Sequence, residues 1–472
     1  MKKRRNTGGS SKLWGGRYES EQDPLFERLH ASIGFDHVLA PYDIQGSRVH
    51  VRMLAKIGVL SEIERDELLR GLDQVETEID NGSFKGELSD EDIHMAIERR
   101  LAEIIGPLAG KMHTGRSRND QVVLDLHLYL ADAVKGHARR LTGLMDALLI
   151  QAERGKNVVI PGYTHMQRAQ PVLLAHHLLA YFFALEREQE RLGDWLLRLQ
   201  MPLGAGALAG VNYPLDREWV AEQLGFARVA PNAMDAVAAR DVAFAYLSVV
   251  TSASLTLSRL AGEIVLWSTQ EYGFATLPDG WTSGSSIMPQ KRNPDGAELV
   301  RGKAAGFLAR LQGLGALTKG LPLAYNSDLQ EDKPFVFASR EELDLCLESM
   351  DAMVRALAFD ADKSRQAAEG GYAQATDVAD YLVQKGLPFR DAHRIAGQLV
   401  GMLAESGRPL ASASIEELWS LSRRFDEAYY DVVDMKRVIA AKVSPGGTAP
   451  ERVAEQLALG RTIMEDLRAQ QT

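Results

Sequence analysis

Residues 120–154 read DQVVLDLHLYLADAVKGHARRLTGLMDALLIQAER, without a proline and with apolar side chains at steps of three and four. This period places them along one face of an α-helix, and Gly155 ends the pattern. A helix over the whole stretch is about three times as long as the average helix of globular proteins. Long amphipathic helices pack side by side, so the stretch predicts one member of a helical bundle. The residues of the apolar face are Val122, Leu126, Leu130, Val134, Leu141, Leu144 and Leu148.

Four further segments show the same helical period, at residues 171–200, 233–272, 294–319 and 334–359. Pro171 suits the first turn of the helix that it opens, because its missing N–H costs nothing there. Charged residues such as Arg259 interrupt these segments and argue against membrane spans. Alternation of the kind found in β-strands is scarce. We therefore expect an all-α protein with a central bundle of five long helices.

Shorter helices are predicted on both sides of the bundle. Before it, residues 61–64 form a capping-box pattern, and Asn81-Gly82 marks a turn. A chain of 472 residues is also too long for one ordinary hydrophobic core. We expect three domains, which are an N-terminal helical domain at residues 1–112, the long-helix domain at 113–361 and a C-terminal helical domain at 362–472.

The composition is that of a folded globular protein, with 45% hydrophobic and 25% charged residues. The net charge of -10 argues against a nucleic-acid partner, which needs a basic surface. The single cysteine, Cys346, cannot form an internal disulfide, which fits a reducing compartment. No apolar stretch follows the basic residues 1–5, and no window has the roughly 18 consecutive apolar residues of a membrane span. These features predict a cytoplasmic protein without a membrane partner.

A polar stretch, HTGRSRND at residues 113–120, comes directly before the first long helix. Arg118 and Asn119 would stand at the helix N-terminus, where guanidinium groups and free backbone N–H groups bind a carboxylate together. A capped helix with solvated arginines explains the same residues without any ligand. The stretch is a candidate carboxylate site, and this alternative stays open.

A second polar stretch, GYTHMQRAQP at residues 162–171, precedes the second long helix. His165 can donate or accept a proton near neutral pH, and Thr164 and Gln167 beside it add hydrogen-bonding groups. A single histidine in a loop is more often structural. We interpret the stretch as a candidate acid or base site with that alternative open.

The third polar stretch, SGSSIMPQKRNP at residues 283–294, joins paired serines to a basic turn bounded by prolines. This composition suggests a mobile loop that closes over an anion. Ser285 is a weak base by itself, but Lys291 and the N–H groups of the loop can stabilise its alkoxide. An exposed flexible loop without a function is the alternative.

Together these motifs resemble a known family. Residues 284–294, with Glu298 further on, are similar to the signature loop of the fumarase/aspartase superfamily. Within that superfamily the chain resembles the argininosuccinate lyases, with Tyr18 and Arg292 as mild variations. The closer resemblance is carried by KLWGGR at 12–17, by residues 114–121 and 162–171, by YNSDLQEDKP at 325–334 and by ATDVADYL at 375–382.

The resemblance implies a reaction without a cofactor, in which argininosuccinate is split reversibly into arginine and fumarate. It implies Ser285 as the general base and His165 as the general acid, although the two roles can also be assigned the other way round. Glu298 would pair with the other ring nitrogen of His165. Lys291 and Asn293 would hold the carboxylates on the fumarate side.

The resemblance also implies which groups bind the substrate. Asp92 is a weaker candidate for its arginine end. No metal is implied, and the only adjacent histidines, His176 and His177, point to different faces of a helix. Carboxylate contacts would come from Ser32, Arg118, Asn119 and Thr164, and the succinate and arginine portions would be held by Tyr325, Gln330 and Lys333.

The polar stretches lie at the ends of different long helices. A straight helix of about 35 residues is roughly 50 Å long, so stretches at opposite ends cannot meet within one chain. The resemblance implies a homotetramer with a common helical core, in which three subunits contribute to each site. Self-association is thus the expected partnership, beside the small-molecule substrate.

Two other interpretations stay open. Fumarases, aspartases and adenylosuccinate lyases share the loop at 284–294 but not the patterns at 116–120 and 325–333 together. A non-catalytic structural protein with this fold would be expected to lose polar residues that add nothing to packing. Activity with argininosuccinate, and its loss in Ser285→Ala, would separate these interpretations.

Overall fold

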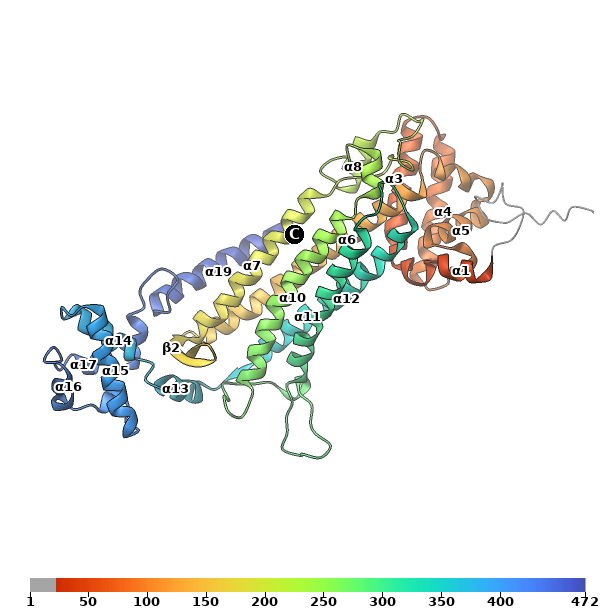
Figure 1. The fold of residues 1–472 in the computed structure, drawn as a ribbon. Helices are drawn as coiled ribbons and strands as arrows, with labels where there is room; N and C mark the ends of the chain where they lie inside the picture. Colours follow the sequence, from red (N-terminus) through yellow and green to blue (C-terminus); the bar gives the residue numbers. More distant parts are fainter. Residues whose placement is uncertain (1–22, 472) are drawn as a thin grey trace, which may run out of the picture. The chain divides into compact units, whose positions relative to one another are not determined.

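The computed structural model describes residues 23–471, which are mostly helical (Figure 1). Two small antiparallel sheets of two strands each accompany the helices in this part of the chain. The motif at 12–17, Tyr18 and the basic residues 1–5 lie outside the described residues. The chain divides into two compact units, each made of three segments.

The five predicted long helices are present. They are α6 (Arg118–Arg154), α7 (Leu174–Arg198), α10 (Asp241–Trp267), α11 (Asp295–Thr318) and α12 (Asp332–Ala356). The prediction of a largely helical chain with five long helices is therefore confirmed. Two details were wrong, which are the start of α7 and the continuity of the helix predicted at residues 233–272.

The first correction concerns Pro171, which does not open a helix. Residues 167–173 form strand β2 (Gln167–Leu173), paired with β1 (Val159–Thr164), and α7 begins only at Leu174. Both strands of a two-stranded hairpin are edge strands, so a proline without an N–H is tolerated there. The hairpin turns at His165 and Met166, whose φ angles are 53° and 58°. Positive φ at both central residues is the geometry of a tight hairpin turn.

The second correction concerns residues 233–272, which do not form one helix. Helix α9 (Ala233–Ala238) ends at Ala239, whose ψ of 125° is extended, and α10 begins at Asp241. The buried guanidinium of Arg240 donates to the carbonyl oxygens of Val237 and Ala239, at 3.3 and 3.0 Å. A side chain thus satisfies carbonyl groups that a continuous helix would have paired.

The first unit comprises residues 1–133, 195–246 and 312–338. It contains α1 (Pro24–His30), α2 (Ile33–Asp36), α3 (Ala40–Lys56), α4 (Glu62–Asp80), α5 (Ile93–Ile105), α8 (Arg217–Leu224) and α9, besides parts of α6, α10, α11 and α12. The predicted capping box of Ser61 and Glu64 opens α4. Fully buried side chains of this unit include Leu39, Ile44, Leu54, Leu68, Leu72, Ile97 and Leu101.

The second unit comprises residues 134–194, 247–311 and 339–472. Within it the long helices form a bundle. Gln151 on α6 donates to the carbonyl oxygen of Val354 on α12 at 2.8 Å, and Gln189 on α7 donates to Thr142 on α6 at 2.8 Å. Other links join Ser252 on α10 to Glu188 on α7, at 2.8 Å, and Lys303 on α11 to Glu342 on α12, at 2.8 Å.

Shorter helices follow the bundle in the second unit, as predicted. They are α13 (Ala361–Glu369), α14 (Ala375–Gln384), α15 (Phe389–Glu405), α16 (Ile415–Leu421), α17 (Tyr429–Val432) and α18 (Met435–Ala440), and α14 to α17 share a hydrophobic core. The remaining strands are β3 (Ala275–Thr276) and β4 (Ala358–Phe359). Short 3-10 turns occur at His37–Leu39, Leu88–Asp90, Gly106–His113, Asp279–Trp281, Ser327–Glu331 and Leu410–Ser412.

The last helix, α19 (Pro450–Gln471), differs from the expectation that only shorter helices follow residue 362. Its buried positions, Val453, Leu457 and Met464, are spaced as in a long amphipathic helix. A Cβ at Gly460 would lie 3.1 Å from a side-chain carbon of Leu149, so α19 packs closely on α6. The spacing of these apolar residues in the sequence is therefore a signal for this helix.

Among the described helices, only α10 is long and apolar enough to pass a length-and-composition test for a membrane span. In its most apolar window, 44% of the residues are buried inside the chain. Core helices of soluble proteins can pass the same test, so the result by itself assigns no membrane role.

Candidate functional site

A pocket of about 130 Å³ lies within the first unit and is lined almost entirely by polar side chains. Four chain segments meet there, which are the start of α2, the start of α5, the start of α6, and the stretch around the 3-10 turn at Ser327–Glu331. Six of the predicted substrate-binding residues line it, namely Ser32, Arg118, Asn119, Tyr325, Gln330 and Lys333.

Arg118 is the first residue of α6, as the sequence predicted for a carboxylate site. Its Nη1 donates to Oε1 of Gln121 at 2.8 Å. Two carboxylates are more distant, with Asp92 at 3.5 Å from Nε and Glu98 at 3.7 Å from Nη2. The guanidinium is therefore oriented mainly by the side-chain amide of Gln121.

Asp120 fixes the start of α6 to a glycine-containing loop. One of its carboxylate oxygens accepts hydrogen bonds from the N–H groups of Gly204 and Gly206, at 2.9 and 2.8 Å. Gly206 has a φ of 62°, and a Cβ there would lie 2.8 Å from the carbonyl oxygen of Gly210, so only glycine fits. The same loop accepts a hydrogen bond from the Asn119 amide through the carbonyl of Ala207, at 3.3 Å.

Ser32 is held by an acidic neighbour in the pocket wall. Its hydroxyl donates to Asp36 at 2.6 Å, and the other carboxylate oxygen of Asp36 accepts from the N–H of Ile93 at 3.2 Å. Burial raises the pKa of Asp36, and the positive charge of His94 opposes this rise. A polar pair thus fixes the hydroxyl between α2 and the start of α5.

The 325–333 stretch supplies the opposite part of the lining. Lys333 is buried, and its Nζ donates to Asp332 at 3.0 Å and to the carbonyl of Leu329 at 3.4 Å. Arg240 also donates to Asp332. Burial favours the neutral form of Asp332, but Lys333 and Arg240 outweigh it and lower its pKa. One carboxylate between two cations leaves a net positive charge, which suits an anionic ligand.

Tyr325 and Gln330 complete this part of the lining. Tyr325 is largely buried, and burial raises the pKa of its phenol, so the hydroxyl is a neutral hydrogen-bonding group. The side-chain amide of Gln330 donates to the carbonyl oxygen of His30 at 2.9 Å. His30 in turn forms an ion pair with Glu91 at 3.0 Å. These contacts fix the side chain of Gln330 before any ligand binds.

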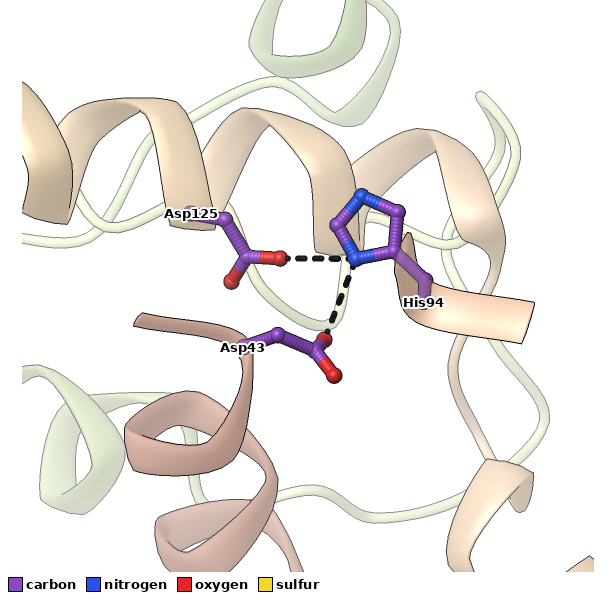
Figure 2. A group of neighbouring side chains, drawn as sticks. All are labelled: Asp43, His94 and Asp125. Atoms are coloured by element: carbon purple, nitrogen blue, oxygen red, sulfur yellow. Dashed lines mark hydrogen bonds and ion pairs between the residues drawn. The ribbon is translucent and has the colours of Figure 1, made fainter. Parts of the chain in front are cut away.

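His94 lines the pocket and belongs to a buried charge cluster (Figure 2). Its Nδ1 lies 3.3 Å from Asp43 on α3 and 3.1 Å from Asp125 on α6. Burial alone would lower the pKa of His94, but the two carboxylates outweigh burial and raise it to about 10. The imidazole is therefore a buried cation at neutral pH.

The 283–294 loop belongs to the second unit and is mostly exposed. The hydroxyl oxygen of Ser285 accepts hydrogen bonds from the N–H groups of Ile287 and Met288, at 3.3 and 3.1 Å. Ser283 and Asn293 exchange two backbone hydrogen bonds at the base of the loop, at 3.1 and 2.8 Å. The loop is thus closed at its base, and its own N–H groups face the serine, as the sequence predicted.

The hairpin of β1 and β2 presents Thr164 and His165 at its exposed tip, also in the second unit. Lys291 is exposed in the 283–294 loop. Glu298 is exposed in the first turn of α11 and lies 3.9 Å from Arg301. Within the described chain, no hydrogen bond or ion pair joins Glu298 to His165. The pairing of Glu298 with His165 therefore stays a prediction.

Several pocket residues were missed by sequence reasoning. Some of them lie at the start of α5, where Asp92 caps the helix by accepting from the N–H of Met95 at 2.7 Å. The motif EDIH at 91–94 was a signal for this wall, but only Asp92 was considered as a weak candidate. The missed lining residues are His30, Asp36, Glu91, His94 and Ser327.

Comparisons with known proteins relate the whole chain to one group of enzymes. Residues 16–307 match a family model described as lyase, and residues 372–440 match the argininosuccinate lyase C-terminal model. The argininosuccinate lyase of Symbiobacterium thermophilum is 46% identical over 96% of this chain and 99% of that protein. The argininosuccinate lyase of Pelotomaculum thermopropionicum is 47% identical over 97% and 99%. Among solved structures, an EDDS lyase variant with bound fumarate has a TM-score of 0.83 and 28% identity, covering 96% of this chain and 92% of that chain.

Proposed function

The chain belongs to the argininosuccinate lyase family and is a carbon–nitrogen lyase, and we propose how its side chains cleave argininosuccinate into arginine and fumarate. The function itself rests on identity near 46% over almost the full length of curated argininosuccinate lyases. The roles of individual residues below rest on the motifs and on the geometry of the two units.

The reaction requires two proton transfers. A base removes a proton from the carbon next to a carboxylate, and the electron pair moves into that carboxylate to give an aci-carboxylate. The pair then forms the double bond of fumarate as the C–N bond breaks, and an acid protonates the departing guanidino nitrogen. Fixed cations and N–H donors lower the energy of the extra negative charge on the aci-carboxylate.

Ser285 is the proposed general base. The N–H groups of Ile287 and Met288, which already donate to its oxygen, support this role because they would stabilise an alkoxide. Lys291 adds a positive charge in the same loop, and Asn293 adds an amide donor for a substrate carboxylate. The loop therefore combines a basic oxygen with groups that bind the product fumarate.

His165 is the proposed general acid, and Thr164 beside it is a proposed carboxylate ligand. The exposed position of both at a tight hairpin tip supports this role, because a projecting tip can enter a site on another copy of the chain. Glu298 would keep the imidazole charged after assembly. An exchange of the base and acid roles is distinguished by the pH dependence of kcat in Ser285→Ala and His165→Asn.

The pocket of the first unit is the proposed substrate-binding site. The observation that carries this proposal is that six motif residues from three distant segments line one polar pocket. Arg118 and the buried positive charge around Lys333 suit the carboxylates of argininosuccinate, while Tyr325 and Gln330 offer neutral polar groups. Asp92 is well suited to a guanidinium at the arginine end.

We further propose a homotetramer in which three subunits contribute to each site. Large apolar side chains that a monomer leaves exposed on the long helices support burial against other copies. They include Leu255 (43% exposed), Leu299 (64%), Leu308 (41%) and Leu345 (55%). Sedimentation should give a tetramer, and a stable, active monomer would refute the proposal.

The three-domain division at residues 1–112, 113–361 and 362–472 also stays a proposal. The separate hydrophobic core of α14 to α17 supports an independent C-terminal domain. We propose a cytoplasmic location for this soluble enzyme, and the buried free thiol of Cys346 is consistent with a reducing compartment.

The direct test is the formation of fumarate, followed by its absorbance. Purified chain should release fumarate from argininosuccinate, and a chelator should leave the rate unchanged. Turnover of adenylosuccinate, or addition of ammonia to fumarate, without activity on argininosuccinate would overturn the assignment. An inactive but folded and tetrameric chain would favour a structural protein instead.

A further inference from the structure

Gln121 joins the buried charge cluster of Figure 2 to the pocket. Its side chain is buried, its Nε2 donates to Asp43, and its Oε1 accepts from Nη1 of Arg118 at 2.8 Å. Both ends of the amide are engaged, so the amide has one defined orientation. A continuous line of contacts therefore runs from Asp125 through His94, Asp43 and Gln121 to Arg118.

The balance of charge explains why this cluster can stay buried. Two carboxylates, Asp43 and Asp125, surround the positive imidazole of His94, and each also feels the positive charge of Arg116. Arg116 is buried and donates to the hydroxyl of Ser47 at 2.9 Å. Removal of one member would leave an uncompensated buried charge, which is strongly unfavourable. The cluster therefore holds its members in one arrangement.

The contact with Gln121 is the closest of the polar contacts of Arg118. The carboxylates of Asp92 and Glu98 lie 3.5 and 3.7 Å away, beyond the roughly 2.7–2.9 Å of a charge-assisted hydrogen bond. A neutral amide orients a guanidinium without cancelling its charge. The fork of Arg118 is therefore oriented by a neutral partner, while the two carboxylates stand at ion-pair distance from it.

We propose that Asp43, His94 and Asp125 act through Gln121 as a positioning network for the guanidinium of Arg118. The network fixes the guanidinium of Arg118 in the pocket wall before the substrate carboxylate arrives. Substrate binding therefore does not lose affinity to the conformational entropy of ordering this side chain. The inference rests on the proposed function, because it takes Arg118 as a substrate ligand. The four other residues act on the substrate through Arg118 and are positioning residues.

A double-mutant cycle on the tetrameric enzyme tests the network. Gln121→Met keeps the side-chain volume and removes both hydrogen bonds, and Arg118→Lys keeps the charge but loses the fork. Gln121→Met should raise KM for argininosuccinate about tenfold and lower kcat less than about threefold, because ligand orientation is affected before the chemistry. In the Arg118→Lys background, Gln121→Met should change KM less than about twofold, since no fork is left to orient.

Two further variants keep the test decisive. Asp43→Asn preserves the shape of the side chain and removes one charge of the cluster, so KM for argininosuccinate should rise about threefold. This variant tests the network if Gln121→Met does not fold. His137→Gln is the matched control, because His137 is also buried and lies 2.8 Å from a carboxylate, Asp344. His137 belongs to the second unit and should leave KM unchanged.

The outcomes separate the network from the proposed function. An unchanged KM in folded Gln121→Met, or equal increases in both backgrounds, overturns the network. An unchanged KM in Arg118→Lys overturns the substrate role of Arg118 itself. A stoichiometric divalent metal that EDTA removes together with activity also overturns the network, because a cation would then occupy the place of the His94 proton.

Discussion

The pocket of the first unit and the projecting elements of the second unit are built in opposite ways. In the pocket, Lys333 is 3% exposed and has two hydrogen-bond acceptors within the chain. On the projecting elements, Ile287 in the 283–294 loop is 86% exposed, and Met166 at the hairpin tip is 57% exposed. The pocket groups proposed to bind the substrate are fixed inside one chain. The groups proposed to move protons, with Thr164 and Asn293 beside them, lie on the exposed elements.

Burial explains the difference. A buried polar group costs free energy unless it is paired, so the pocket groups come with partners that also orient them. Exposed groups are solvated and need fewer such partners. The imidazole of His165 is therefore open to a ligand, and the hydroxyl of Ser285 accepts from N–H groups of its own loop. Substitutions in the two regions should therefore have different signatures in stability and in activity.

The largest contrast is expected in Ser285→Ala. Loss of the proposed base should lower kcat by about a thousandfold or more, because the C–H proton is weakly acidic. The free energy of unfolding should change by less than about 0.5 kcal/mol, since the side chain contacts only its own loop. Steady-state kinetics and denaturant unfolding measure the two quantities, with Ser286→Ala as the control. Activity within tenfold of the unchanged enzyme would remove Ser285 from the mechanism.

A pocket residue should affect both quantities. Lys333→Met should lower kcat/KM about a hundredfold and also reduce the free energy of unfolding by about 1–3 kcal/mol. The reason is that buried Asp332 would keep only Arg240 as a partner. Kinetics and denaturant unfolding on one preparation give both values. A loss of activity without a loss of unfolding free energy would contradict the predicted difference between the pocket and the exposed loop.

Substitutions at two backbone positions with positive φ, one in each region, should differ in the same way in their effect on the free energy of unfolding, but by less. Gly206→Ala should reduce the free energy of unfolding by about 2 kcal/mol, because its φ is 62° and the new Cβ would meet the carbonyl of Gly210. Met166→Gly should change it by less than about 1 kcal/mol, in the stabilising direction, since φ there is 58° in an exposed turn. Thermal unfolding of the two variants compares them, and equal losses would contradict the contrast.

A separate contrast is expected in the pH dependence of stability. The pKa of His94 is about 10 in the folded chain and about 6.5 in an unfolded one, so the folded state binds the extra proton between these values. The resulting stabilisation is fully present below pH 6.5 and is lost as pH rises through 10. His94→Gln should therefore flatten the fall of the unfolding midpoint between pH 7 and 10, whereas exposed His165→Gln should keep the slope. Equal slopes in both variants would argue against a charged His94.

Much of the fold followed from local patterns. The apolar period of residues 120–154 predicted α6, and the capping pattern at Ser61 predicted the start of α4. The hairpin at residues 159–173 was missed because a short polar stretch with prolines carries neither helical nor strand periodicity. The break before α10 was missed because the partners of Arg240 are backbone carbonyls, which no side-chain pattern reveals.

The site was predicted to a similar extent. Motifs identified Arg118 and Lys333, and both line the pocket. The contact of Asp120 with Gly204 and Gly206 spans more than eighty residues, and nothing in the sequence near Asp120 indicates it. The roles of His165 and Ser285 stay predictions, because they depend on how copies of the chain assemble.

The amino-acid sequence by itself determined the helical class, the long central helices and the chemical nature of the three polar stretches, since period and residue type are local properties. Only the tertiary structure decided which of these polar groups share a pocket and which project from the chain. It also decided that His94 is a buried cation between Asp43 and Asp125 (Figure 2). The protonation and orientation of a buried group depend on neighbours that packing brings from distant segments, and those neighbours are not written beside it in the chain.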